Sequence, residues 1–333
     1  MAEVERLKSF TMPGKKAFEA QIAALDSLRQ QPDGARKDPL RKALGHRNNF
    51  IVAKAADLAR EFSLTDLTDD LLKAFDRFFE NPEKTDPQVW AKNALARTLA
   101  TFEVQEPEVF LRGMRHIQME PVWGGRSDTA GTLRSTCALA LVQCRSLTDA
   151  DLLAHLLDLL ADHDKAVRAE AARAIEQVGS PSASLLLRLR AKLDRDEPEV
   201  LGACYNGVLR IEGVRAIKWV ARFLEAGDDC AGEAALAIAA THSPESFEAL
   251  RAPLCHVSDP WFRSLLLSAI ALTRQQAAMD FLFDLVRTES LDAERAIEAI
   301  LRSMPSQDLT QRLEKVAAGN PRLARAFATL RQA

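Results

Sequence analysis

The stretch DKAVRAEAARAI, from Asp164 to Ile175, contains the pattern that decides the fold. Its apolar residues, continued to Val178, follow helical spacing and form one face of a helix. Several of them are alanines, which let a second helix approach closely. We therefore expect this segment to be the inner helix of a packed pair of short helices. The residues of the face are Val167, Ala171, Ala174, Ile175 and Val178.

The same face recurs along the chain at nearly regular intervals. Its first residue lies at positions 51, 89, 133, 167, 200, 230, 262 and 292. The first two intervals are 38 and 44 residues, and the later ones approach 30, which holds two short helices and two tight turns. The pattern predicts an all-α fold without β-sheet. The inner helices should begin near residues 49, 87, 131, 165, 198, 228, 260 and 290.

The turns before these helices repeat in the same register. Asp86-Pro87, Glu197-Pro198 and Asp259-Pro260 all fall where Asp164-Lys165 falls in the clearest repeat. An acidic residue that caps a helix, followed by proline in the first helical position, is a strong helix-start signal. The caps and the apolar faces therefore indicate the same helix boundaries independently.

The inner-helix pattern resembles that of HEAT-like repeats, of the kind found in phycobilisome lyases. The resemblance is carried by Val167-Arg168, Ala171-Ala172 and Ala174-Ile175, is repeated at Leu133–Leu141, and covers most of Arg36–Arg302. It implies a right-handed α-solenoid (an α-α superhelix) of about eight helix pairs, continuous over residues 1–333. We expect an N-terminal cap at 1–35, irregular repeats at 36–132 with a loop insertion at 117–132, regular repeats at 133–305, and a C-terminal cap at 306–333.

Composition argues against several classes of function. The net charge is −3, whereas nucleic-acid binders usually carry a basic excess that neutralises phosphates. No apolar run is long enough to suggest a membrane span or a signal peptide, so we expect a cytoplasmic protein without membrane association. The five cysteines form no CxxC motif and lie in helical patterns, so we expect buried, reduced thiols. They are Cys137, Cys144, Cys204, Cys230 and Cys255.

The strongest departure from the repeat is the segment Glu120–Thr132, which contains Trp123 and three glycines. It is either a structural elbow, with the tryptophan filling a gap, or a loop that contacts a partner. The turn at His46–Asn49 is interpreted as a helix cap, with a contribution to a groove as the alternative. Asp162-His163-Asp164 is interpreted as a solvated turn rather than a metal site, and we expect no cofactor and no metal.

Two ladders of side chains are expected to run along the array. Lys54 and Lys92 occupy equivalent repeat positions and begin a basic ladder, while Arg134, Arg168 and Arg263 are expected to tie neighbouring repeats together. Tryptophan and arginine are favoured where binding energy is concentrated. We therefore predict a groove in the N-terminal half that takes an anionic or carboxylate-bearing partner. Its lining would be Lys54, Lys92, Asn93, Trp123, Arg126, Asp128 and Arg134.

Three functions are compatible with these patterns. The first is a non-enzymatic scaffold or adaptor that binds a protein or peptide on its concave face. The second, implied by the resemblance alone, is a phycobilisome-lyase-like protein. The third is a HEAT-like DNA glycosylase or another nucleic-acid binder, in which Trp90, Trp123 and Asp128 could meet a lesion. The balanced charge of the N-terminal half, with 20 basic and 20 acidic residues before Thr132, argues against this third function.

Overall fold

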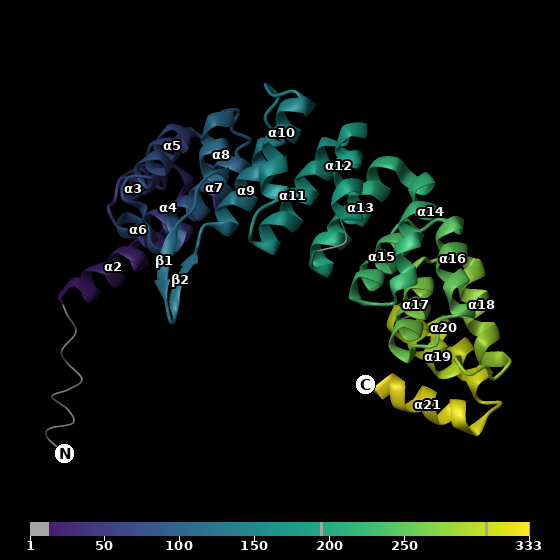
Figure 1. Ribbon diagram of the computed structural model, residues 1–333. Coiled ribbons are helices and arrows are strands. Elements are labelled where there is room, and N and C mark those ends of the chain that lie inside the picture. The colour runs from purple at the N-terminus through teal and green to yellow at the C-terminus, as the bar shows by residue number, and fades with distance from the viewer. Residues whose placement is uncertain (1–12, 194–195, 304–305, 333) are drawn as a thin grey trace, which may run out of the picture. The chain divides into compact units, whose positions relative to one another are not determined.

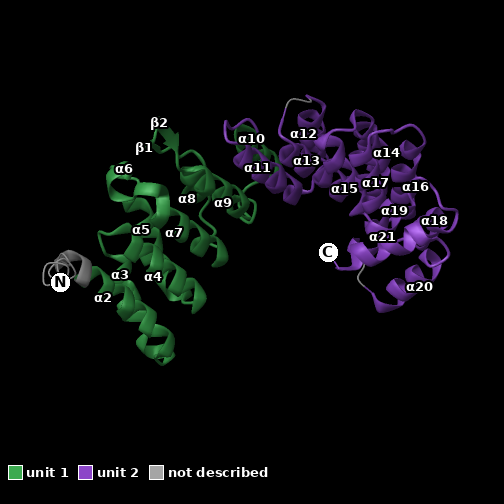
Figure 2. Cartoon of the chain, turned by 90° about the horizontal axis from the view of Figure 1, so that it is seen from below, with its two compact units in different colours: residues 1–159 green, residues 160–333 purple. Residues whose placement is uncertain are grey.

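Short helices make up nearly all of the regular structure. The computed structural model describes residues 13–193, 196–303 and 306–332, and 76% of the chain is helical. This confirms the all-α class, although one small sheet is present. The chain divides into two compact units, residues 1–159 and 160–333, which Figure 2 shows in green and purple. None of the helices that the structure describes is long and apolar enough to cross a membrane.

In unit 1, three inner helices pack side by side, and each is covered by a shorter helix. The short helix α6 (Pro82–Thr85) and the 3₁₀ turn η4 (Pro87–Val89) lead into the second inner helix. Further 3₁₀ turns lie at η1 (Leu28–Gln30), η2 (Asp33–Ala35) and η3 (Thr65–Leu67). The inner helices are α4 (Asn49–Glu61), α7 (Trp90–Thr101) and α9 (Gly131–Leu141); the others are α2 (Pro13–Ser27), α3 (Lys37–Leu44), α5 (Thr68–Arg77), α8 (Pro107–Met114) and α10 (Asp149–Leu160) (Figure 1).

In unit 2, the inner helices form a row from α11 to α21, and each inner helix packs on the next. The row is α11 (Lys165–Val178), α13 (Pro198–Glu212), α15 (Asp229–Ala239), α17 (Pro260–Leu272), α19 (Ala293–Ser303) and α21 (Pro321–Gln332). The covering elements are α12 (Pro181–Lys192), η5 (Gly213–Ala216), α14 (Ile217–Val220), η6 (Ala221–Ala226), α16 (Pro244–Arg251), η7 (Ala252–Cys255), α18 (Gln276–Arg287) and α20 (Gln307–Ala317).

The predicted starts of the inner helices agree with the observed ones to within three residues. The caps explain this agreement. The side chains of Asn48, Asp164 and Asp259 accept hydrogen bonds from main-chain N–H groups in the first turns of α4, α11 and α17. Asp86 does the same for α7, because its carboxylate accepts from the N–H groups of Ala91 and Lys92.

Small residues fill the contacts between inner helices. Ala171, Ala172, Ala235 and Cys137 are fully buried, which confirms the predicted helical face. Cys144 and Cys204 are also buried. The prediction that all five cysteines are buried is wrong, because Cys230 is partly exposed and Cys255 is exposed. Cys255 ends the 3₁₀ turn η7 rather than lying within a packed α-helix, so no neighbouring helix covers it.

In unit 2, arginine and aspartate side chains link successive repeats at their ends. Arg168 of α11 donates to Asp196, just before α13, over 2.6–3.1 Å, and also to the main-chain carbonyls that precede its own helix. Arg263 of α17 is bonded in the same way to Asp292, just before α19. These contacts confirm the expected tie between neighbouring repeats for Arg168 and Arg263.

The packing between inner helices predicts the effect of a larger side chain. Ala172→Leu should overpack α11 and lower the free energy of unfolding by about 1–3 kcal/mol, because the side chain is fully buried. Ala166→Leu is the matched control, since Ala166 is exposed on the same helix. Urea denaturation followed by circular dichroism measures both. Equal stability of the two variants would mean that the helical face is assigned wrongly.

The ion pair between Asp196 and Arg168 predicts that replacing Asp196 lowers folding stability by an amount that depends on pH. Burial alone would raise the pKa of Asp196, but hydrogen bonds from Arg168 and Arg190 outweigh it and hold the pKa below its ordinary value. Asp196→Asn should therefore cost about 3 kcal/mol near neutral pH. A depressed carboxyl pKa stabilises the fold above the unfolded-state value, so the difference from wild type should shrink as the pH falls below about 4.

The control for this loss is Glu170→Gln, which removes an exposed ion pair with Arg173 and should cost under about 1 kcal/mol. Denaturant midpoints measured from pH 3 to 8 give both differences. A loss for Asp196→Asn no larger than that of the control would show that the tie does not hold the repeats.

Candidate functional site

The loop insertion is a β-hairpin, which corrects the prediction that the chain has no sheet. Strand β1 (Met119–Val122) pairs antiparallel with β2 (Gly125–Asp128), with Val122 opposite Gly125. In Figure 1 the hairpin extends beyond the neighbouring helices of unit 1. Gly124 forms the turn with a φ of 92°, a left-handed conformation that glycine adopts readily. Trp123, the other turn residue, is fully exposed.

Exposure alternates along the first part of the hairpin in an unusual sense. Ile117 and Met119 are exposed, while Gln118 and Glu120 are almost fully buried. A strand with one side on a protein core normally turns its apolar side chains inward and its polar ones outward. Here the side toward the helices is polar and the outer side is apolar, so hydrogen bonds rather than apolar packing hold the hairpin in place.

Glu120 fixes the hairpin to the turn before α7. Its carboxylate accepts from the N–H of Gln88 at 2.8 Å and from the side-chain amide of Gln88 at 2.7 Å. Gln88 and Val89 both have positive φ, at 62° and 57°. This conformation is costly for any residue other than glycine, and most of all for a β-branched one such as Val89. The contacts from Glu120 help to hold this strained turn.

A buried ion pair lies beneath the same turn. Lys92 Nζ is 3.1 Å from Asp86 Oδ2 and donates to the carbonyl of Phe78, and both charged side chains are fully buried. Asp86 also accepts from the side-chain amide of Asn49, and its carbonyl accepts from Gln118. Burial lowers the pKa of Lys92, and the charge of Asp86 opposes this shift. The pair joins α4, α7 and the hairpin.

A second buried pair closes the base of the hairpin. Arg134 of α9 donates to Asp128 at 2.6 Å and to the carbonyl of His116. Burial alone would raise the pKa of Asp128, but hydrogen bonds from the N–H groups of Gln118 and Ala130, and from Arg134, hold it below its ordinary value. Likewise, the hydrogen bonds to Glu120 outweigh its burial and lower its pKa. Both carboxylates are therefore charged at neutral pH.

The predicted site residues separate into two groups. Trp123 is exposed, and Arg126 is about half exposed and donates to Glu83 at 2.9 Å. Lys54 is partly exposed and paired with Asp26 at 2.7 Å, and Asn93 is partly buried. The others are buried at the base of the hairpin, so the prediction that they line an open groove is corrected. They are Lys92, Asp128 and Arg134.

Aromatic residues form a row across α2, α4 and α7, which we call the aromatic row. Its members are Phe18 of α2, Phe50 of α4 and Trp90, the first residue of α7, with successive ring centroids 5.6 and 5.5 Å apart. Phe50 and Trp90 are exposed, and Trp90 follows the turn that Glu120 holds. The sequence analysis missed this row, although the aromatic residue at the start of two successive inner helices was an available signal.

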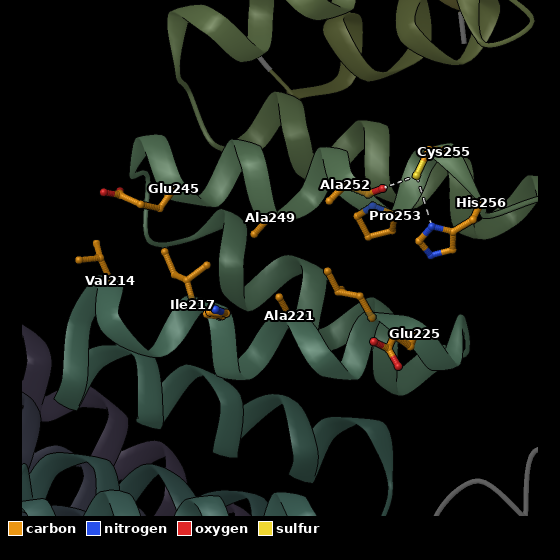
Figure 3. Close-up of a pocket in the computed structure, with 12 residues that line it drawn as sticks. Val214, Ile217, Ala221, Glu225, Glu245, Ala249, Ala252, Pro253, Cys255 and His256 are labelled. Atoms are coloured by element: carbon orange, nitrogen blue, oxygen red, sulfur yellow. Dashed lines mark hydrogen bonds between the residues drawn. The ribbon is translucent and has the colours of Figure 1, made fainter.

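Unit 2 has a groove of its own, between the η5–η6 stretch and α16–η7 (Figure 3). Its volume is about 540 Å³, and its walls are mostly apolar. Cys255 Sγ lies 3.4 Å from Nδ1 of His256 at one end, and Glu245 lies at the other. The adjacency of Cys255 and His256 in the chain was the available sequence signal for this end of the groove.

No protein-family model matches the chain, and neither does any curated protein.

The hydrogen bonds between Glu120 and Gln88 predict that loss of the Glu120 side chain loosens the hairpin locally and does not unfold the whole chain. Glu120→Ala leaves the buried side-chain amide of Gln118 short of one acceptor and removes the contact with the N–H of Gln88, which should lower the free energy of unfolding by about 1–3 kcal/mol and loosen the hairpin. Amide hydrogen exchange of residues 117–128 should accelerate, while α17 and α19 should be unaffected. Glu83→Ala, which removes the exposed partner of Arg126, is the control. Unchanged exchange in Glu120→Ala would show that the hairpin is held in another way.

Proposed function

We propose that the chain is a HEAT-like repeat protein, a right-handed α-solenoid of about eight helix pairs that acts as a non-enzymatic scaffold or adaptor. Support comes from the rows of inner helices within each unit and from the arginine–aspartate ties at their ends. Repeat arrays of this kind bind partners over extended surfaces. The proposed partner is a protein or a peptide.

The observation that carries the proposal is the exposure of Trp123 on an anchored hairpin. Trp123 is fully exposed on the same hairpin as three further exposed apolar side chains, and an exposed apolar patch marks an interaction site where a single exposed side chain does not. The buried contacts of Glu120 and Asp128 fix the hairpin before any partner arrives, so little conformational entropy is lost on binding. Large aromatic side chains on rigid supports are the usual centres of binding energy.

The charges around the hairpin favour an apolar contact rather than an anionic one. Lys92 is buried against Asp86, Lys54 is paired with Asp26, and Arg126 is paired with Glu83. The cations that indicated an anionic partner are therefore already neutralised within the chain. The exposed side chains near Trp123 are apolar instead, namely Ile117, Met119 and Val122. We expect the partner to cover Trp123 with an apolar surface of its own.

The test begins with a photoreactive residue at Val122, which is exposed beside Trp123. It should crosslink a partner from an extract of the native host, and the partner is then purified. In isothermal titration, Trp123→Ala should weaken binding by about tenfold or more, because the truncated side chain is a central contact. Thermal stability should be unchanged, since the side chain makes no buried contacts in the free chain.

The matched control is Trp261→Ala, which removes a half-exposed tryptophan from unit 2. This variant should bind the partner as wild type does. Normal binding by Trp123→Ala, together with a loss for Trp261→Ala, would place the working surface in unit 2 and refute the proposal.

A further inference from the structure

The outer edge of β2 carries main-chain groups that the hairpin itself does not use. The N–H of Thr129 donates to the carbonyl of Gln118, and the register places Glu120 opposite Ser127 and Val122 opposite Gly125. Hydrogen-bonded and non-hydrogen-bonded pairs alternate along an antiparallel ladder. The pair between Pro121 and Arg126 is therefore of the second kind. The N–H and C=O of Arg126 point away from β1, toward the outer edge.

The opposite edge of the hairpin, along β1, is less able to pair with another strand. Pro121 has no N–H to offer there. The carbonyl of Met119, which also points outward, already accepts a hydrogen bond from the Arg126 guanidinium. Proline and a covering side chain are devices that prevent an edge strand from pairing. Their presence on β1 makes the edge of β2 the better template for another strand.

The edge of β2 is accessible and pre-formed. Gly125, Arg126 and Ser127 are all exposed. A Cβ atom built on Gly125 would meet no atom within 4 Å, so a second backbone can approach closely at this point. The contacts of Glu120 and Asp128 hold the hairpin to the helices, which makes the edge a fixed template.

We propose that the edge of β2 binds an extended segment of a partner protein, which adds a third strand through the main chain of Arg126. This inference rests on the proposed function, which identifies the Trp123 end of unit 1 as the contact surface. The main chain of Arg126 offers one donor and one acceptor, and an extended backbone supplies the complementary pair. Val122 and Trp123, both exposed, offer apolar contact to a side chain of the added strand. A third strand also stabilises a hairpin that has only two.

The test uses random phage-displayed peptides selected on the full chain, with the enriched peptides labelled for fluorescence anisotropy. Two substitutions at one position separate main chain from side chain. Arg126→Ala keeps the outward N–H and should change the affinity by less than about threefold. Arg126→Pro removes this N–H while leaving the internal ladder intact, and should weaken binding by about tenfold or more. Pro121→Ala changes only the opposite edge and should bind these peptides as wild type does.

Each outcome has a defined meaning. A large loss for Arg126→Pro alone, with protection of the Arg126 amide from hydrogen exchange in the complex, supports strand addition. Equal binding by Arg126→Pro and Arg126→Ala overturns it, as does the failure to select any peptide. If binding of the selected peptides is unaffected by Arg126→Pro but still requires Trp123, the proposed function survives and only strand addition is wrong. If binding depends on neither Trp123 nor Arg126, both proposals are refuted. Self-association of wild type that Arg126→Pro abolishes would identify the occupant as a second copy, which also overturns the proposal.

Discussion

The close approach of short, alanine-rich inner helices is the constraint on which the rest of the structure depends. No helix of this length can bury its apolar face alone, so each one needs a neighbour on both sides. Small residues at the contacts, such as Ala172 and Cys137, let the helices approach closely. They offer no hydrogen bonds to the main-chain groups at the helix ends. The ends are where polar groups gather. In unit 2, arginine–aspartate pairs satisfy both the charges and the carbonyls of the turns.

Unit 1 meets the same constraint in a different way. Asp86 binds Asn49 from the preceding inner helix, the first turn of its own helix, and the buried Lys92. The hairpin is bonded to this cluster through Gln118 and Glu120. A break in the repeat has therefore become a polar core that carries a projecting element. The exposed tip is placed by contacts that are themselves almost wholly buried.

The sequence predicted the helices well because their determinants are local. The cap at Asp164 and the helical spacing of Val167, Ala171 and Ala174 both lie within the first turns of a single helix. The site was predicted only in part. Trp123 and Arg126 are exposed, as a contact loop requires, but the burial of Lys92 was not predicted. The ladder assumed that the helix begins near residue 87 and already includes Val89, whereas Val89 lies in a left-handed turn and α7 begins at Trp90. A shift in phase of this kind depends on Glu120, 32 residues away from Gln88, and no local pattern encodes it.

The reversed polarity of the hairpin has a consequence for how the sequence can diverge. Gln118, Glu120 and Asp128 each satisfy main-chain groups of other segments, so their replacement would disturb elements far beyond the strand. The tip makes no such contacts, and residues 122–125 are all exposed. Side-chain replacements there have little structural cost, except at Gly124, where the positive φ would strain any other residue. We expect related chains to retain the polar base while the tip changes rapidly, so that one anchored framework presents different tips to different partners.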